Sequence, residues 1–202
     1  MATTPLRRRN PRGEGGRLRE HLLDAAGELL RERGDARAVS VRAVTARAGV
    51  SPSALYLHFA GVEELLSAVL DRSFAELRRY LHAAERAHEG DPDAQLLAMG
   101  HAYLAFALER PGQYATIFGA RHEKGAGGID PALGDAAFDD LVRAVARCLR
   151  PGDERDPHAV AASVWVEMHG MVTLRHALPT FPWPPIDAML EEVVKGHIRR
   201  VQ

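Results

Sequence analysis

Apolar residues recur at spacings of three and four along most of this 202-residue chain, which is the period of an amphipathic α-helix. The first stripe predicts a helix from about Arg17 to Arg33 that stops at Gly34. Its apolar members are Leu18, Leu22, Ala25, Ala26, Leu29 and Leu30. No segment shows the alternation of β-branched and polar residues that a half-buried strand requires. The pattern therefore predicts an all-α fold.

Three more helices are expected before residue 91. Ser40 is a suitable N-cap for a short helix that ends at Gly49, since glycine adopts the positive φ of a helix end at no steric cost. Ser51 and Pro52 predict a third helix, to about Phe59, with proline at the first helical position. A long fourth helix is interrupted at Asp91-Pro92, and its apolar stripe consists of Leu65, Leu66, Val69, Leu70, Phe74, Leu77 and Leu81.

The rest of the chain predicts five helices, over about 93–109, 112–118, 131–149, 156–178 and 186–201. Proline and glycine separate them at Pro111, 124–128, Pro151-Gly152 and 179–185. The polar residues 1–15 are expected to form a disordered basic arm.

The net charge of −1 hides an uneven distribution of charge. Residues 1–61 carry 11 Arg and 6 acidic residues, whereas residues 62–202 carry 15 Lys and Arg and 21 acidic residues. A basic N-terminal part on an acidic body indicates a polyanionic partner at one end of the molecule, unless the asymmetry is accidental.

Composition also restricts the class of protein. No apolar run is long enough to span a membrane, and no apolar stretch follows the N-terminal arginines as a secretory signal would require. Cys148 is the single cysteine, so an internal disulfide and a cysteine-based zinc cluster are excluded. We therefore expect a cytoplasmic protein without a cofactor.

Residues 40–59 predict a helix-turn-helix around Ala48-Gly49-Val50. Its small core would consist of Val44, Ala48, Val50, Leu55 and Phe59, which leaves Arg42, Thr45, Ser53, Tyr56 and His58 pointing outward. Such a hairpin can place its second helix in the major groove of DNA, with Tyr56 and His58 on phosphates and Arg42 and Ser53 at base edges. A helical hairpin with a purely structural role would have the same outline.

The segment from Arg17 to Leu70 resembles the DNA-binding domain of the tetracycline-repressor (TetR) family. The matching motifs are Leu23-x-Ala25-Ala26, Leu29, Gly34, Ser40-Val41-x-x-Val44, Ala48-Gly49-Val50-Ser51, Leu55-Tyr56-x-His58-Phe59 and Glu63-Glu64-Leu65-Leu66. The resemblance implies that the helix near Ser51 is the recognition helix and that Tyr56 and His58 contact the DNA backbone.

One position departs from the family pattern. The family usually has a phosphate-contacting lysine directly before Glu-Glu-Leu, and here this position is Val62. Arginines of the arm, namely Arg7, Arg8, Arg9 and Arg12, can replace the missing cation if they are more than a solvated tail. The expected DNA-binding residues are therefore Arg42, Thr45, Ser51, Ser53, Tyr56, His58, Arg7, Arg8 and Arg9.

A recognition helix of about two turns reads few base pairs, so we expect a homodimer on a palindromic operator. The last two helices are the expected interface because they are apolar over more than one face. One stripe of 156–178 contains Val160, Val164, Met168, Met171 and Val172, and its neighbour contains Ala161, Trp165, His169, Val172 and His176. The arc of 186–201 contains Ile186, Met189, Leu190, Val193, Val194, His197, Ile198 and Val201. Burial of both faces within one subunit is the alternative.

Residues 101–119 and the motif Trp165-x-x-x-His169-Gly170 resemble the ligand domain of a TetR subgroup. The resemblance implies a small-molecule site lined by Phe106, Tyr114, Phe118, Phe138, Trp165, Met168, His169 and Val172. Packing in the core is the alternative for each of these residues. The expected domains are residues 16–62 for DNA binding and 63–202 for ligand binding and dimerisation.

These inferences predict a ligand-responsive transcriptional regulator, a repressor that a small-molecule effector releases from its operator. No nucleophile–base arrangement indicates an enzyme, and His169 and His176 are too far apart on their helix to bind one metal ion together. A helical small-molecule-binding dimer with no specific DNA target is the alternative, and Val62 is the residue that favours it.

Overall fold

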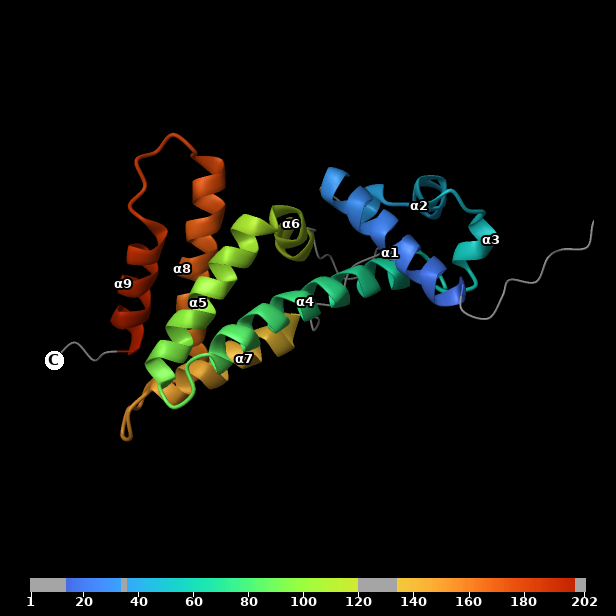
Figure 1. Ribbon diagram of the computed structural model, residues 1–202. Helices are drawn as coiled ribbons and strands as arrows, with labels where there is room; N and C mark the ends of the chain where they lie inside the picture. Colours follow the sequence, from blue (N-terminus) through green and yellow to red (C-terminus); the bar gives the residue numbers. More distant parts are fainter. Residues whose placement is uncertain (1–13, 34–35, 120–133, 199–202) are drawn as a thin grey trace, which may run out of the picture. The chain divides into compact units, whose positions relative to one another are not determined.

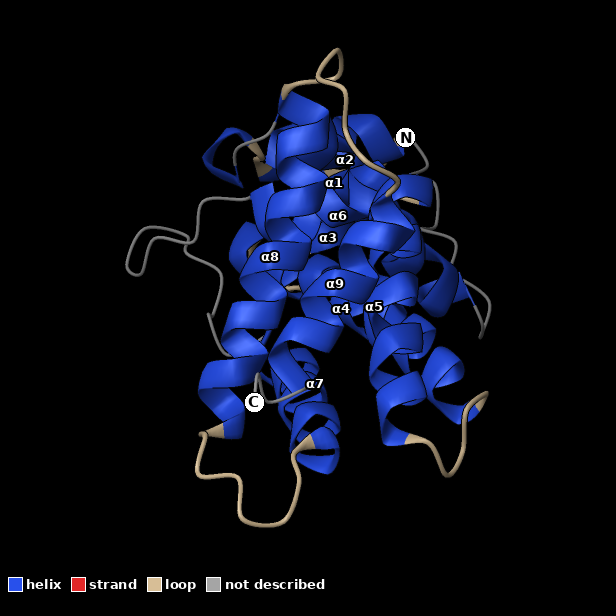
Figure 2. Cartoon of the chain, turned by 90° about the vertical axis from the view of Figure 1, so that its left-hand side faces the viewer, coloured by secondary structure: helices blue, strands red, loops and turns tan. Residues whose placement is uncertain are grey.

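The computed structural model describes residues 14–33, 36–119 and 134–198, and these are mainly helical (Figure 1). Within these ranges there are nine α-helices and one short 3-10 helix, and Figure 2 shows no strand. The all-α prediction is confirmed. The elements are α1 (Glu14–Arg33), η1 (Ala36–Ala38), α2 (Val41–Ala48), α3 (Pro52–Leu55), α4 (Val62–Arg86), α5 (Pro92–Glu109), α6 (Pro111–Gly119), α7 (Asp135–Cys148), α8 (Pro157–Ala177) and α9 (Ile186–Ile198).

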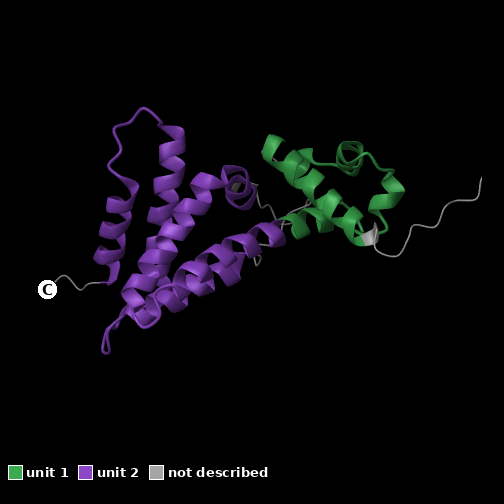
Figure 3. Cartoon of the chain, in the orientation of Figure 1, with its two compact units in different colours: residues 1–69, 120–129 green, residues 70–119, 130–202 purple. Residues whose placement is uncertain are grey.

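The described residues form two compact units (Figure 3). Unit 1 contains α1, η1, α2, α3 and the first residues of α4, up to Val69. Unit 2 contains the remainder of α4, from Leu70, together with α5 to α9. Helix α4 begins at Val62, at the expected domain limit between residues 62 and 63, whereas the two units divide within α4, after Val69. The expected domain limit stays a prediction.

Unit 1 is organised by the apolar stripe of α1, which packs against α2. The stripe is buried from Leu22 to Leu30, as its spacing predicts. Arg47 on α2 also binds Glu28 and Glu32 on α1, with nitrogen–oxygen distances of 3.1 and 2.7 Å. The predicted helix end at Gly34 and the predicted disordered arm over residues 1–15 lie outside the described residues, apart from the start of α1.

The ends of α2 are those that the sequence predicts. The Ser40 hydroxyl accepts a hydrogen bond from the Ala43 N–H at 3.3 Å, and Gly49 has a φ of 67°. The following helix is shorter than predicted, because α3 ends at Leu55 and the N–H of His58 bonds the carbonyl only three residues back, at 2.9 Å. The chain from Tyr56 to His58 is therefore a turn, and the prediction of a helix to Phe59 was wrong.

Helix α5 lies at the centre of unit 2 and packs against α6, α7, α8 and α9. Its N-terminus is capped by Asp91, whose carboxylate accepts the Ala94 N–H at 3.0 Å. The helix is buried on several faces, through Leu96, Met99, Gly100, Tyr103, Leu104, Phe106 and Ala107. A helix that is apolar around most of its circumference requires such a central position.

Helices α8 and α9 pack against each other and are joined by residues 178–185 (Figure 1). The first apolar stripe of α8, from Val160 to Val172, is buried in unit 2, and so are Leu190, Val194 and Ile198 of α9. Much of the apolar surface of these two helices therefore belongs to the core of one subunit. Val166 and Leu174 of α8 remain exposed, at 65% and 49%.

None of the helices within the described residues combines the length and the apolar character that crossing a membrane requires.

Gly100 permits the contact between α5 and α9. A Cβ atom at this position would lie 2.8 Å from Cδ1 of Leu190, a fully buried side chain that would have to shift. We expect Gly100→Val to lower the free energy of unfolding by about 1–3 kcal/mol, measured by chemical denaturation. Gly16→Val is the control, because no atom lies within 4 Å of a Cβ there. Equal stability of the two variants would contradict this contact.

Candidate functional site

Helices α2 and α3 and the turn that follows α3 present a row of exposed side chains. Tyr56 and Leu57 are 58% and 74% exposed, which is unusual for side chains of this size, and Arg42, Ser51 and Ser53 are also exposed. His58 is half-buried. The predicted residues Arg42, Ser51, Ser53, Tyr56 and His58 thus lie on one short segment of two helices, whereas Leu57 was not predicted.

The core beneath this surface holds α2 and α3 in place. Val44, Ala48, Leu55 and Phe59 are buried, as predicted, and Val50 is half-buried. The hydroxyl of Ser51 lies 2.8 Å from that of Ser53 and makes no hydrogen bond to the backbone of α3. Both hydroxyls therefore remain at the surface, where a polar partner can reach them.

Thr45 does not point outward, and this prediction was wrong. Its side chain is 2% exposed, and its hydroxyl donates a hydrogen bond to the carbonyl of Val41 at 2.9 Å. The reason is helical register: Val41, Val44, Thr45 and Ala48 follow the i, i+3, i+4, i+7 spacing of one face. That face packs inward, so Thr45 supports α2 and has no surface to offer DNA.

The two arginines of α2 have different surroundings. Arg47 is held by Glu28 and Glu32 of α1, and the hydrogen bonds that it donates to Glu32 and Glu28 raise its pKa. Arg42 is exposed, and its guanidinium forms no ion pair with any residue of the described ranges. Arg42 is therefore the arginine of α2 that is available to an anionic partner.

The first turn of α4 carries negative charge. Val62 begins the helix, Glu63 and Glu64 follow, and a carboxylate oxygen of Glu64 accepts the Ala60 N–H at 2.6 Å. Acidic side chains stabilise a helix N-terminus. The position directly before them, where the resemblance led us to expect a lysine, is Val62. The arginines proposed as replacements, Arg7, Arg8, Arg9 and Arg12, lie outside the described residues.

In unit 2, aromatic rings from α6, α7 and α8 form one cluster, hereafter the ring cluster. Phe118 lies 5.0 Å from His169 and 6.1 Å from Trp165, measured between ring centroids. Trp165 lies 5.8 Å from Phe138, and Tyr114 stacks on His169 at 5.6 Å. Five of the eight predicted ligand-binding residues are thus brought together: Tyr114, Phe118, Phe138, Trp165 and His169.

The other three lie within the apolar core of unit 2. Phe106 is fully buried and makes an edge contact with Tyr80 at 5.7 Å, so no ring contact joins it to the ring cluster. Met168 and Val172 are buried on the first stripe of α8. The structure therefore favours core packing over ligand contact for these three residues.

Two residues that adjoin the ring cluster were not predicted from the sequence. Tyr103 is buried, and its hydroxyl lies 2.9 Å from that of Tyr114 and 3.3 Å from Nδ1 of His169. Phe74 of α4 makes an edge contact with Phe118 at 6.4 Å. Tyr103 stands in the segment 101–119 that carried the resemblance, but its contact with His169 spans 66 residues and no local pattern indicates it.

Comparison with known proteins agrees with both units. The family model described as "Bacterial regulatory proteins, tetR family" matches residues 22–69, and the model "Tetracyclin repressor-like, C-terminal domain" matches residues 96–197. The chain belongs to the TetR family. Proteins of this family are transcriptional regulators and not enzymes; they bind operator DNA and effectors and are dimeric.

Two curated relatives and one solved TetR-like structure extend this result. The chain is 29% identical over 109 residues to the uncharacterised HTH-type regulator YobS of Bacillus subtilis, which covers 54% of this chain and 56% of that protein. It is 38% identical over 85 residues to the HTH-type transcriptional repressor Rv3405c of Mycobacterium tuberculosis, which covers 41% and 44%. These matches span about half the length of the relatives or less.

The solved structure is a TetR-like transcriptional regulator from Rhodococcus sp. RHA1, with a TM-score of 0.69 and 22% identity. It covers 93% of this chain and 98% of that one, so it shows the same fold.

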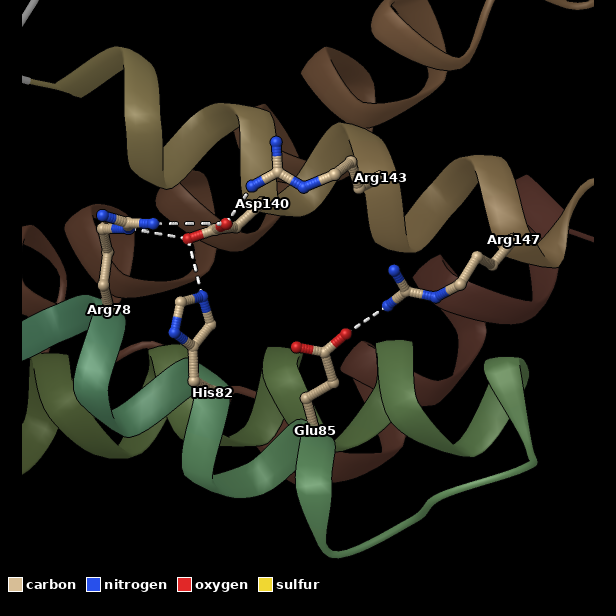
Figure 4. Close-up of polar contacts among 6 residues, drawn as sticks. All are labelled: Arg78, His82, Glu85, Asp140, Arg143 and Arg147. Atoms are coloured by element: carbon tan, nitrogen blue, oxygen red, sulfur yellow. Dashed lines mark hydrogen bonds and ion pairs between the residues drawn. The ribbon is translucent and has the colours of Figure 1, made fainter.

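In this TetR protein a buried carboxylate ties α4 to α7 (Figure 4). Asp140 of α7 accepts hydrogen bonds from Nε of Arg78 at 2.7 Å and from Arg143, and its oxygen lies 2.8 Å from Nε2 of His82. Burial raises the pKa of Asp140, but the hydrogen bonds from Arg78 and His82 outweigh burial and hold the pKa below its usual value. The charge on Asp140 therefore stabilises the packing of α4 on α7.

We expect Asp140→Asn to lower the free energy of unfolding by about 1.5–3 kcal/mol at pH 7, because the hydrogen bonds that Asp140 accepts would no longer have a charged acceptor. Since the pKa of Asp140 is lower in the folded state, this stabilisation is complete above about pH 5 and decreases as the pH falls below about 4. The difference in free energy of unfolding between the wild type and Asp140→Asn should therefore become smaller in acid. Chemical denaturation at several pH values measures this difference.

Glu85→Gln is the matched control for this prediction, because Glu85 pairs with Arg147 across the same two helices but is more exposed. It should cost less than about 1 kcal/mol. An Asp140→Asn variant as stable as the wild type at pH 7 would contradict the role of the carboxylate.

Proposed function

We propose that this protein is a dimeric repressor that binds a palindromic operator through α2 and α3 and releases it when a small molecule occupies the ring cluster. The observation that carries the proposal is the exposed row Arg42, Ser51, Ser53, Tyr56 and Leu57 on a helix-turn-helix whose core is buried. A short helical segment that exposes polar and aromatic side chains over a rigid core can enter the major groove.

The exposed side chains suit different contacts with DNA. The Tyr56 hydroxyl and the His58 ring can donate hydrogen bonds to phosphates, which fixes position but reads no sequence. Arg42 and Ser53 can reach base edges, and an arginine free of ion pairs is suited to the paired acceptors of guanine. The hydroxyl of Ser51 and the arm arginines Arg7, Arg8 and Arg9 are proposed as further backbone contacts.

The outer face of α8 supports the proposed dimer. Val166, Gly170 and Leu174 follow a helical spacing, and apart from the nearby backbone of α8 itself no described atom lies within 4 Å of a Cβ placed on Gly170. A glycine inside a helix costs about 1 kcal/mol relative to alanine. That cost is offset if a second copy of α8 packs closely on Gly170. We propose that α8 and α9 form this two-fold interface.

The ring cluster is the proposed effector site because it combines exposed aromatic surface with a few polar atoms. Trp165 remains exposed, and Phe118, Phe138 and His169 are half-buried. Phe118 also contacts Phe74 of α4, the helix that begins directly after the helix-turn-helix. An effector that displaces Phe118 would act on α4, and a coupling of about 1–3 kcal/mol would lower operator affinity about 5- to 150-fold.

Selection of genomic DNA fragments by the purified protein tests this function. Fragments of the source genome retained at moderate salt should share an inverted repeat, and a Tyr56→Ala, His58→Ala variant should retain none of them. If the retained fragments share no sequence, or if the variant retains the same fragments, the protein is a helical ligand-binding dimer without a specific DNA target. The apolar Val62, at the position where the family usually has a lysine, is the observation that favours this second function.

A further inference from the structure

Three polar atoms meet inside the ring cluster, and their arrangement bears on the chemistry of the effector. The Tyr114 hydroxyl lies 2.6 Å from Nδ1 of His169, the Tyr103 hydroxyl lies 3.3 Å from the same nitrogen, and the two hydroxyls are 2.9 Å apart. These atoms come from α5, α6 and α8. They form a closed triangle of possible hydrogen bonds between two phenols and one imidazole.

The triangle fixes which nitrogen of His169 carries the proton. If Nδ1 is unprotonated, Tyr114 donates to Nδ1 and Tyr103 donates to the Tyr114 oxygen, so every proton has an acceptor. If Nδ1 is protonated, it donates to Tyr114 and Tyr114 donates to Tyr103, which leaves the buried Tyr103 O–H without an acceptor in the triangle. An unpaired buried donor destabilises the protein, so the first arrangement is preferred.

Burial also favours the uncharged forms of the two phenols and of the imidazole. It raises the pKa of Tyr103 and raises that of Tyr114 to about 12, so both phenols keep their protons at neutral pH. It also lowers the pKa of His169, which favours the neutral ring. A neutral His169 with Nδ1 as acceptor must carry its proton on Nε2.

The Nε2–H of His169 is therefore a fixed donor on the opposite edge of the ring. It makes no hydrogen bond to any residue between 14 and 33, 36 and 119, or 134 and 198. Its ring neighbours Phe118 and Trp165, at centroid distances of 5.0 and 6.3 Å, present aromatic faces, and the indole N–H of Trp165 is directed to the Tyr103 hydroxyl. A molecule that binds here meets aromatic faces and one oriented, uncharged N–H donor.

We propose that the effector is an uncharged, mainly apolar ring compound whose carbonyl-type oxygen accepts a hydrogen bond from Nε2 of His169. This inference rests on the proposed function, since it specifies the ligand class of the same site. The neutral phenols and imidazole provide no countercharge, and a carboxylate would lose hydration without an ionic partner. The tyrosines act on the ligand through His169 and are positioning residues.

Acetophenone and ethylbenzene test the proposal, because they have nearly the same shape and only acetophenone carries a carbonyl oxygen. Equilibrium dialysis with the full-length protein should show acetophenone binding about three- to tenfold more tightly, the effect of one hydrogen bond. Para-acetylbenzoate, which adds a charge, should bind more weakly than acetophenone. In a Trp183→Phe background Trp165 is the single tryptophan, so quenching of its fluorescence by acetophenone locates the site.

Two substitutions of His169 separate its two nitrogens. His169→Gln can place an amide N–H near the position of Nε2 and should keep the preference for acetophenone. His169→Asn can offer Tyr114 an acceptor near the position of Nδ1 but has no atom at Nε2, so the two probes should bind equally. Tyr114→Phe should reduce the preference while ethylbenzene still binds, because the proton on Nε2 is no longer fixed.

The proposal is overturned by three results: equal binding of both probes to the wild type, an unchanged preference in His169→Asn, or tightest binding of para-acetylbenzoate. Binding of genomic DNA fragments without any probe is measured separately on the same preparations. Loss of probe selectivity with intact fragment binding refutes the ligand class alone, whereas absence of fragment binding refutes the proposed function.

Discussion

Replacing Tyr56 and His58 together with alanine is expected to weaken operator binding about a hundredfold to a thousandfold. Each side chain is proposed to donate one hydrogen bond to a phosphate, and a dimer makes four such contacts. At about 1 kcal/mol each, their loss corresponds to this range. Electrophoretic mobility shifts on a selected genomic fragment, at fixed salt concentration, measure the change.

Folding should survive this change, since Tyr56 is exposed and His58 is not part of a buried core. Leu108→Ala provides the control, because Leu108 is 56% exposed, close to the 58% of Tyr56, but lies on α5 in unit 2. This variant should bind the operator as the wild type does. If the double variant keeps its affinity while Arg42→Gln loses it, the proposed contacts of Tyr56 and His58 are wrong and α2 carries the binding.

Val166→Glu is expected to raise the dissociation constant of the dimer about a thousandfold or more. The two-fold axis would bring both copies of the new carboxylate to one apolar interface, and a buried unpaired charge costs several kcal/mol. Sedimentation at micromolar concentration should then show monomers. Operator affinity should fall together with the dimer, because one recognition segment reads too few base pairs.

Leu108→Glu is the matched control for the interface, since it adds the same charge at another exposed apolar residue of unit 2. It should remain dimeric and bind the operator normally. A Val166→Glu protein that is dimeric at nanomolar concentration would show that the outer face of α8 is not the interface.

Periodicity and capping rules predicted most helices of the described chain, because each limit depends on local chemistry. Ser40 and Asp91 cap α2 and α5 as their side chains allow, and Gly49 ends α2 with positive φ. The small core of the helix-turn-helix also followed from spacing alone. The exposure of Arg42, Ser51, Ser53 and Tyr56 could therefore be predicted, whereas that of Leu57 was missed.

The errors in unit 1 have local causes that spacing did not resolve. Thr45 was treated as a polar surface residue, but its register on α2 places it with Val41 and Val44. The hydroxyl satisfies its own donor on the backbone, which lets a polar side chain occupy a buried position. Helix α3 ends at Leu55 because of turn hydrogen bonds that a Ser-Pro start does not reveal.

In unit 2 the unpredicted features depend on contacts between distant parts of the chain. Asp140 meets Arg78, 62 residues earlier, and no local pattern marks Asp140 as buried. Tyr103 meets His169 across 66 residues. Single-sequence reasoning identified the aromatic residues of the ring cluster but not the hydrogen bonds that orient them.

The stoichiometry of the complex with the shortest retained genomic fragment tests the proposed function most directly. Native mass spectrometry should show two chains on one duplex, and footprinting should show two protected half-sites about one or two helical turns apart around a two-fold axis. A single chain on a fragment without an inverted repeat, or the absence of any complex at low salt, would contradict a dimeric operator-binding protein.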